Sequence, residues 1–261
     1  MNKTTVVSLL LLMKTMTMHA QDVSALGKEY LQNTANVLVP TLSTELMMTA
    51  GKPQNERLKK LLLEKATNPS EFTGKRIALV ATDGYEEIEL LTPYNYFKDR
   101  GATVTIVAPK YNQTPLHEGS LYPEMRKTHI LGVRWMSNQG WIKFDKTLDE
   151  VAANDFDALI LPGGLANPDK LRLEKKAISL IQEMFKQGKT IAAICHGPQV
   201  LINAGILTGK RVTAVESLLA DLKNAGGLVE DTAVVVDGNL ITSRTPLDLP
   251  DFIGAISKRL K

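Results

Sequence analysis

TIAAICHGPQVLINAG, residues 190–205, decides the fold of this chain. Its first five residues have the composition of a buried strand, and the stretch that starts at His196 has the pattern of a helix. Only a tight turn fits between the two, and Gly197 gives that turn a residue without a Cβ. A buried strand that runs directly into a helix is typical of the parallel sheets of α/β proteins.

The same alternation of apolar strands and helices extends to both sides of this stretch. The remaining elements are KRIALVAT (75–82) with a helix ending near Gly101, TVTIVAP (103–109), FDALILPGG (156–164) with the helix DKLRLEKKAISLIQEMFKQG (169–188), RVTAV (211–215) with the helix ESLLADLKNAG (216–226), the strands TAVVVDG (232–238) and NLITSR (239–244), and a last helix LPDFIGAISKRL (249–260). Asp237-Gly238-Asn239 between two apolar runs indicates one antiparallel hairpin. We therefore expect an α/β fold, a mostly parallel sheet with helices on both faces.

The N-terminal part of the chain has a different character. Residues 1–20 resemble a secretory signal peptide, with a lysine, a short apolar run and a polar end at Ala20, and this predicts export to the periplasm or beyond. If the leader stays attached, the protein is cytoplasmic instead; the run is too short to span a membrane, which takes about 20 apolar residues. Residues 21–73 are expected to form an extension with one amphipathic helix over 55–66, and residues 74–261 the α/β domain.

Composition and the long connection at residues 110–146 limit the partners. The net charge of +3 and the lack of a basic block with aromatics argue against a nucleic-acid partner. The connection holds Trp135 and Trp141, which favours an ordered flap or hairpin at the edge of the sheet. Its two histidines, His117 and His129, lack the spacing of a ligand set, so no metal site is expected.

Polar groups follow four of the predicted strands, at the edge where α/β sheets bind ligands, and we expect them to converge. They are Glu86, Glu87 and Glu89, then Gly163 and Gly164, then Cys195 and His196, and finally Ser243 and Arg244.

Cys195 is the single cysteine of the chain, so it cannot form an intramolecular disulfide. A thiol at the start of a helix faces the positive end of the helix dipole, which favours the reactive thiolate. His196 beside it is a candidate general base or cationic partner. The alternatives are a small buried hydrophobic residue for Cys195 and an ordinary surface residue for His196.

The acids and glycines complete the candidate site. Glu86, Glu87 and Glu89 could each cap the helix that they open; Glu89, between apolar neighbours, is expected to keep its proton and donate a hydrogen bond to a thiolate. Gly163 and Gly164 could form a simple turn or let the backbone approach a substrate, with the Gly164 and His196 amides stabilising an oxyanion.

The motifs KRIALVATDGYEEIEL, FDALILPGG with NPDKLR, AAICHGPQVLINAGILTGKRVTA and AVVVDGNLITSRTPLDLPDF follow one another in this order. From Lys75 to Lys261 the chain resembles the ThiJ/PfpI family, relatives of class I glutamine amidotransferase domains. The resemblance implies a flavodoxin-like sheet, with Cys195 as nucleophile, His196 as its partner and Glu89 as the buried acid. It implies that Asp169 orients the histidine of a neighbouring subunit, and hence a homo-oligomer, a dimer or hexamer; the alternative for Asp169 is a helix N-cap.

The resemblance also bears on function. Val215 stands where some relatives carry an aromatic residue or a histidine, so the substrate does not follow from the family. We expect a hydrolase without a cofactor that acts on glycated protein or amino-acid adducts or on small dicarbonyls and protects against stress. The alternatives are a cysteine peptidase of the PfpI type, a redox sensor in which Cys195 is oxidised, or a chaperone that uses the extension.

Overall fold

The strand, turn and helix predicted around Cys195 are present. The computed structural model describes residues 55–111, 123–134 and 137–261. Strand β8 (Thr190–Ile194) is buried along its whole length, and helix α8 (Pro198–Ala204) starts four residues after it ends. Pro198 suits the first turn of a helix, and Gly205 ends the helix in the left-handed conformation that glycine adopts easily.

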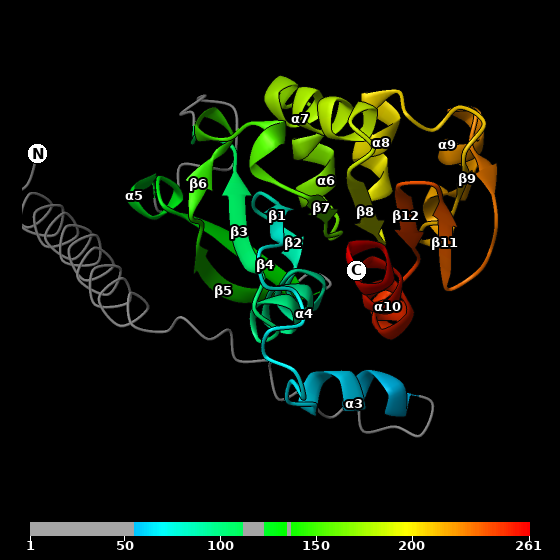
Figure 1. Cartoon of the computed structure of the whole chain (residues 1–261). Coiled ribbons are helices and arrows are strands. Elements are labelled where there is room, and N and C mark those ends of the chain that lie inside the picture. Colours follow the sequence, from blue (N-terminus) through cyan, green and yellow to red (C-terminus); the bar gives the residue numbers. More distant parts are fainter. Residues whose placement is uncertain (1–54, 112–122, 135–136) are drawn as a thin grey trace, which may run out of the picture. The chain divides into compact units, whose positions relative to one another are not determined.

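A seven-stranded sheet forms the centre of the fold, in the order β11-β12-β8-β7-β1-β3-β6 (Figure 1). Besides β8, its strands are β1 (Arg76–Val80), β3 (Thr103–Ala108), β6 (Lys146–Thr147), β7 (Ala158–Leu161), β11 (Val234–Asp237) and β12 (Leu240–Ser243). All neighbouring strands pair in parallel except β11 and β12. The hairpin predicted at Asp237-Gly238-Asn239 is thus confirmed, and so is the mostly parallel α/β sheet.

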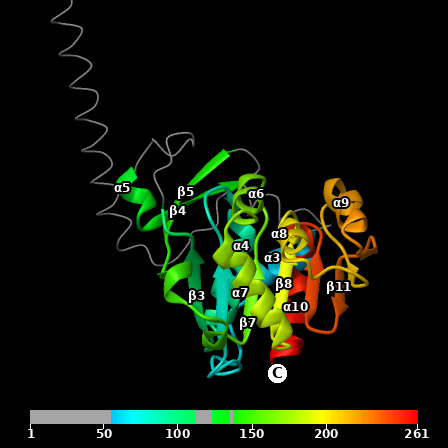
Figure 2. The ribbon, with the colours of Figure 1, turned by 90° about the horizontal axis from the view of Figure 1, so that it is seen from above.

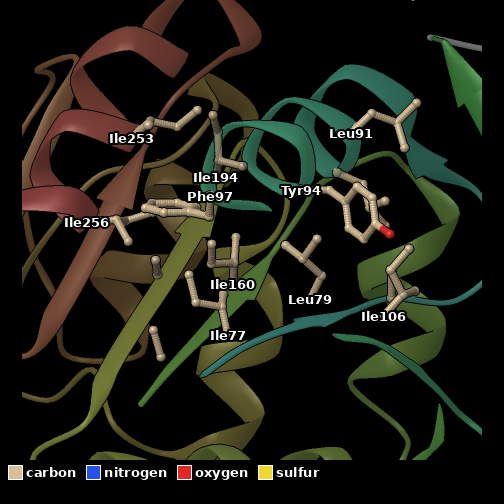
Figure 3. Close-up of a cluster of buried hydrophobic side chains, with 14 of the residues drawn as sticks. Ile77, Leu79, Leu91, Tyr94, Phe97, Ile106, Ile160, Ile194, Ile253 and Ile256 are labelled. Atoms are coloured by element: carbon tan, nitrogen blue, oxygen red, sulfur yellow. The ribbon is translucent and has the colours of Figure 1, made fainter. Parts of the chain in front are cut away.

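Helices cover both faces of this sheet because successive strand residues point to opposite sides. On one face, α4 (Glu87–Lys98) and α10 (Leu249–Leu260) pack on Ile77 and Leu79; on the other, α7 (Lys175–Lys186) and α8 pack on Ala78 and Val80. Figure 2 looks onto the α7 and α8 side. Figure 3 shows side chains of the first face, among them Ile77, Leu79, Leu91, Phe97, Ile160, Ile194, Ile253 and Ile256.

Two predicted elements differ from the structure. The segment RVTAV forms only the two-residue strand β9 (Arg211–Val212), which pairs with β10 (Leu228–Val229) outside the main sheet. Arg211 is exposed and pairs with Glu230, which a strand buried on both faces would not permit. The helix expected from Asp169 to Gly188 is two helices, α6 (Ala166–Leu171) and α7, separated by a turn in which Leu173 is exposed.

The long connection contains a hairpin, as predicted. Strands β4 (His129–Arg134) and β5 (Ser137–Lys143) are antiparallel and form a small sheet with β2 (Tyr85–Glu86), while β6 extends the edge of the main sheet. Trp141 lies opposite Leu131 in this hairpin. Residues 112–122 and Trp135 lie outside the described residues.

Part of the N-terminal extension is described. Helix α3 (Glu56–Leu63) starts where predicted, ends three residues earlier, and packs on α10 through the buried Leu58. Arg57 donates two hydrogen bonds to Asp251 of α10, at 2.9 and 2.6 Å. The predicted signal peptide and the extension up to residue 54 lie outside the described residues, and no described helix is long and apolar enough to cross a membrane.

The remaining elements are short. They are α5 (Pro123–Arg126), α9 (Leu219–Asn224) and the 3-10 helices Leu148–Glu150, Ala153–Asp155, Glu216–Leu218 and Pro246–Asp248. Helix α5 belongs to a unit of the chain that is separate from the unit that contains the main sheet.

Candidate active site

Cys195 occupies the turn between β8 and α8 in a strained conformation. Its φ is 59°, and among the residues that the structure describes it is the one non-glycine residue with positive φ. Such a conformation costs about 1–3 kcal/mol and persists only where the surrounding structure enforces it. The Cys195 amide donates to the Ser243 carbonyl at 3.1 Å, and the Cys195 carbonyl accepts from the Val215 amide at 3.2 Å. The end of β12 and Val215, which precedes the 3-10 helix Glu216–Leu218, therefore hold the backbone of Cys195 in place.

Two glycines make this turn possible. A Cβ on Gly197 would lie 2.4 Å from the Leu161 carbonyl oxygen, so no larger residue fits where the chain enters α8. A Cβ on Gly163, at the end of β7, would lie 2.8 Å from each of three groups: the Cys195 Cβ, the His196 amide and Glu89 Oε2. Gly163 therefore lets the backbone after β7 approach the thiol and the acid closely.

Glu89 lies in the first turn of α4 and is completely buried. The Gly163 amide donates to its Oε2 at 2.7 Å, while Oε1 has no hydrogen-bond partner within the described part of the chain. Burial and the negative charge of Glu86 raise the pKa of Glu89 to about 8, against the opposing effects of the Gly163 amide and the Cys195 thiol. At neutral pH the carboxyl therefore keeps its proton, as predicted, and can act as a donor toward the thiol.

His196 is the nearest base. The Cys195 Sγ lies 3.3 Å from the His196 Nδ1, and burial lowers the pKa of His196, so its imidazole is neutral at pH 7 and can accept a proton. Burial and the charge of an ionised Glu89 raise the pKa of Cys195; the His196 amide opposes them. The raised pKa of Cys195 differs from the prediction that the start of the helix favours the thiolate, because the effect of burial is larger than that of the helix start. When Glu89 is protonated, its charge no longer disfavours the thiolate.

Gly164 follows Gly163 with a φ of +86°, and a Cβ there would lie 2.1 Å from the Gly84 carbonyl oxygen. Its amide has no acceptor within the described part of the chain, and the His196 amide faces the Cys195 sulfur. The His196 amide is thus close to the thiol, and the Gly164 amide follows the glycine that touches Cys195; the role of the two amides as an oxyanion hole stays a prediction.

The sequence model of the DJ-1/PfpI family matches residues 75–259, which carry this thiol, imidazole and buried acid. The chain belongs to the DJ-1/PfpI family. The predicted membership of the ThiJ/PfpI family is thereby confirmed.

Three proteins illustrate the similarity. The chain is 38% identical over 186 residues to Deglycase PfpI of Pyrococcus furiosus, and this alignment covers 71% of this chain and 99% of that protein. It is 37% identical over 179 residues to Protein/nucleic acid deglycase 2 of Escherichia coli, covering 68% and 93%. A crystal structure from Anabaena variabilis, of a two-domain protein with DJ-1/ThiJ/PfpI-like and ferritin-like domains, matches with a TM-score of 0.62 and 37% identity. That match covers 71% of this chain and 48% of the two-domain chain, so this DJ-1/PfpI chain spans about half of its length.

Asp169 has another hydrogen-bond partner than the predicted histidine in this DJ-1/PfpI chain. It is exposed in α6, and its Oδ1 accepts a hydrogen bond from Gln199 Nε2 at 3.3 Å rather than from His196. The alternative role as a helix N-cap is wrong, because α6 begins at Ala166 and already contains Asp169 in its first turn.

Glu86 and Glu87 do not cap α4 with their side chains. Arg134, which is buried at the end of β4, donates to Glu87 Oε2 at 2.7 Å, and its Nε lies 3.8 Å from Glu86 Oε1. Burial raises the pKa of Glu87 and the Arg134 charge opposes this. One weak signal of this contact is present in the sequence, an arginine within the alternating strand HILGVR, but nothing there indicates its partners.

Of the predicted pair Ser243 and Arg244, only Ser243 lies at the site. Ser243 reaches Cys195 through its backbone carbonyl, while its hydroxyl donates to the Ala233 carbonyl at 2.7 Å. Arg244 pairs with Asp231 and Asp248, so its charge serves the local structure after β12. Among the described residues, no group of three or more His, Cys, Asp or Glu side chains could hold a metal ion.

Proposed function

We propose that this DJ-1/PfpI protein is a cysteine hydrolase that removes dicarbonyl-derived adducts from amines, a deglycase that needs no cofactor. The contact between Cys195 and His196, beside the protonated Glu89, carries the proposal. Two relatives with 37% and 38% identity, matched over 93% and 99% of their length, bear the name deglycase and support it.

The side chains divide the proton transfers between them. The neutral His196 imidazole takes the proton of the Cys195 thiol, and the Glu89 carboxyl keeps the thiolate free of a neighbouring negative charge. The Gly164 and His196 amides stabilise the oxygen of the carbon that is attacked. Gly163 lets these groups lie close together.

The reaction that fits these groups begins with an adduct of methylglyoxal and an amine. The thiolate attacks the carbon that bears nitrogen and hydroxyl, a C–S bond forms, the C–N bond breaks, and the amine leaves with the proton held by His196. His196, neutral again once the amine has taken its proton, removes the proton of this carbon and an enediol forms; return of the proton to the neighbouring carbon, the former carbonyl carbon, yields a thioester. One water hydrolyses the thioester, so adduct and water become free amine and lactate, and the thiol is restored.

Asp169 belongs to the proposal as a residue that acts between subunits. Because it is exposed in α6, it is free to meet the His196 of a second copy, and the exposed Leu165 and Leu173 flank it. Light scattering coupled to gel filtration tests the oligomer, and an Asp169→Ala protein with unchanged kcat would remove Asp169 from the mechanism. Export is a separate proposal, tested by N-terminal sequencing of the mature protein.

The decisive experiment compares substrates on one protein. We expect the wild-type protein to release free amine and lactate from methylglyoxal-treated amino acids and the Cys195→Ala protein to release neither. A fluorogenic peptide serves as the substrate of the peptidase alternative. If amine release is unchanged in Cys195→Ala, the thiol is not the nucleophile; if only the peptide is cleaved, the protein is a peptidase.

A further inference from the structure

Asn167 is a fully buried polar side chain that joins the ends of two strands. It lies in α6, and its Oδ1 accepts a hydrogen bond from the Thr82 amide, just after β1, at 2.7 Å. Its Nδ2 donates to the carbonyl oxygens of Pro162 and Gly163, just after β7, at 2.9 and 3.1 Å. The carboxamide therefore fixes the turn after β7 against the end of β1 through three hydrogen bonds.

The turn that Asn167 holds is the one that touches the acid and the thiol. The Gly163 amide donates to Glu89 Oε2, and the Gly163 carbonyl also accepts from the Glu86 amide at 3.2 Å. The space beside Gly163 is smaller than one methyl group, as the 2.8 Å distances from its hypothetical Cβ show. A small displacement of this turn would change the contact with Glu89 and move the Gly164 amide as well.

Only a carboxamide suits this position. An aspartate of the same shape would set a second acceptor against the Pro162 and Gly163 carbonyls. A leucine would remove the partner of the Thr82 amide and the donor to the Pro162 carbonyl, and would leave the Gly163 carbonyl with the Glu86 amide alone. Each buried backbone group without a partner costs about 1–3 kcal/mol. The side chain is thus matched to the backbone groups around it.

We propose that Asn167 is a positioning residue of the active site, which holds the Gly163 amide on Glu89 and, through the same turn, sets the position of the Gly164 amide. It touches neither the thiol nor a substrate and acts through the turn. The part of the inference that concerns turnover rests on the proposed function, whereas the part that concerns the acid and the thiol does not.

The surroundings of Glu89 give the direction of the expected effect. Charged and titratable groups reach this region from four elements. They are Glu86 of β2, Glu87 at the start of α4, Arg134 at the end of β4, and Cys195 with His196 in the turn after β8. The Gly163 amide lowers the pKa of Glu89 against the other effects. Misalignment of this amide therefore raises the pKa of Glu89 further.

The test uses the Asn167→Ser protein, which removes the carboxamide without adding a charge. Asn239 offers a matched control, because its Nδ2 also donates to two carbonyl oxygens, those of Phe185 and Lys189, at 3.1 and 2.8 Å. Asn239 lies next to the start of β12, which runs parallel to β8, whereas Cys195 follows the end of β8. Asn239→Ser therefore removes the same kind of contact at the opposite end of these strands, away from the site.

Two measurements are made on each protein: the rate at which iodoacetamide alkylates Cys195, the single cysteine, from pH 6 to 10, and kcat with KM for a methylglyoxal-treated amino acid. In the wild-type protein the alkylation rate should rise less steeply once Glu89 ionises. In Asn167→Ser we expect the pH at which the alkylation rate begins to rise less steeply to be higher by roughly half a unit or more. We also expect kcat to fall about tenfold or more while KM stays within about twofold of the wild-type value. Asn239→Ser should show neither change.

The outcomes separate the explanations. If Asn167→Ser loses thermal stability as Asn239→Ser does and keeps the wild-type alkylation profile and kcat, Asn167 has only a structural role and the inference is wrong. If Asn167→Ser does not fold, the isosteric Asn167→Asp replaces it. A kcat at pH 7 well below that of the wild-type protein then supports the inference, and an unchanged kcat contradicts it. If the wild-type protein turns over no adduct, the proposed function fails, while the alkylation profiles still decide the role of Asn167.

Discussion

The buried acid Glu89 makes the stability of the native state depend on pH. Its pKa lies at about 8, above the ordinary value of 4.5, so between these values the folded protein holds a proton that the unfolded chain releases. Stability therefore falls as pH rises through this interval, by about 1.4 kcal/mol per pH unit from this one group. Across the interval the loss comes to roughly 4–5 kcal/mol, a large part of the stability of a typical domain.

The substitution Glu89→Gln removes this dependence. Glutamine keeps the shape of the protonated carboxyl, and its oxygen can still accept from the Gly163 amide. Its amide group then takes the place of Oε1, a constant cost of about 1–3 kcal/mol that does not vary with pH. Other titrating groups, such as Glu87, change in both proteins alike, and their effects cancel in the comparison.

Urea unfolding at pH 5, 6, 7 and 7.5 measures the effect. The free energy of unfolding of Glu89→Gln minus that of the wild-type protein should rise steadily with pH, by about 1.4 kcal/mol per unit, and should be most negative at pH 5. Leu90→Met, a change of similar volume at the adjacent buried residue of α4, serves as a control whose difference stays constant. A constant difference for Glu89→Gln as well would refute the claim that Glu89 is protonated in the folded protein.

Three further predictions concern positions around the site. Gly164→Ala should destabilise the fold by more than about 3 kcal/mol, measured by urea unfolding, since its Cβ would overlap the Gly84 carbonyl in a conformation that alanine disfavours. Arg134→Met should cost about 3–5 kcal/mol at pH 7 and less at pH 5, because burial raises the pKa of Glu87 and loss of the Arg134 charge removes the effect that opposes this; an equal loss at both pH values would contradict the buried ion pair. Arg57→Ala should change the melting temperature little, because its ion pair with α10 is exposed and such pairs contribute less than about 1 kcal/mol.

What the sequence predicted well was determined locally. Four apolar residues before Cys195 (191–194), the glycine after His196 and the proline at the start of α8 fix a strand, a turn and a helix within one short segment. The apolar neighbours of Glu89 placed it in the interior for the same reason, because a helix that packs on a sheet must bury one side of its first turn.

What the sequence missed depends on contacts between distant segments. Asn167 bonds Thr82 across 85 positions of the chain, and Arg134 meets Glu87 across 47. Neither arginine nor asparagine carries a local signal of such a partner. The division between α6 and α7 and the pairing of β9 outside the main sheet likewise follow from packing, since charged residues in both segments allow more than one local structure.

The features around Cys195 share one physical property: each is unfavourable by itself. The thiol has a positive φ, the acid is buried with one oxygen lacking a partner in the described part of the chain, and two glycines leave no room for a side chain. Such costs persist where the surrounding backbone is held firmly, and here Ser243, Val215 and Asn167 hold it from three directions. It follows that substitutions which relieve strain at this end of the sheet should stabilise the fold and weaken the reactivity of the thiol together, since both effects have the same geometric origin.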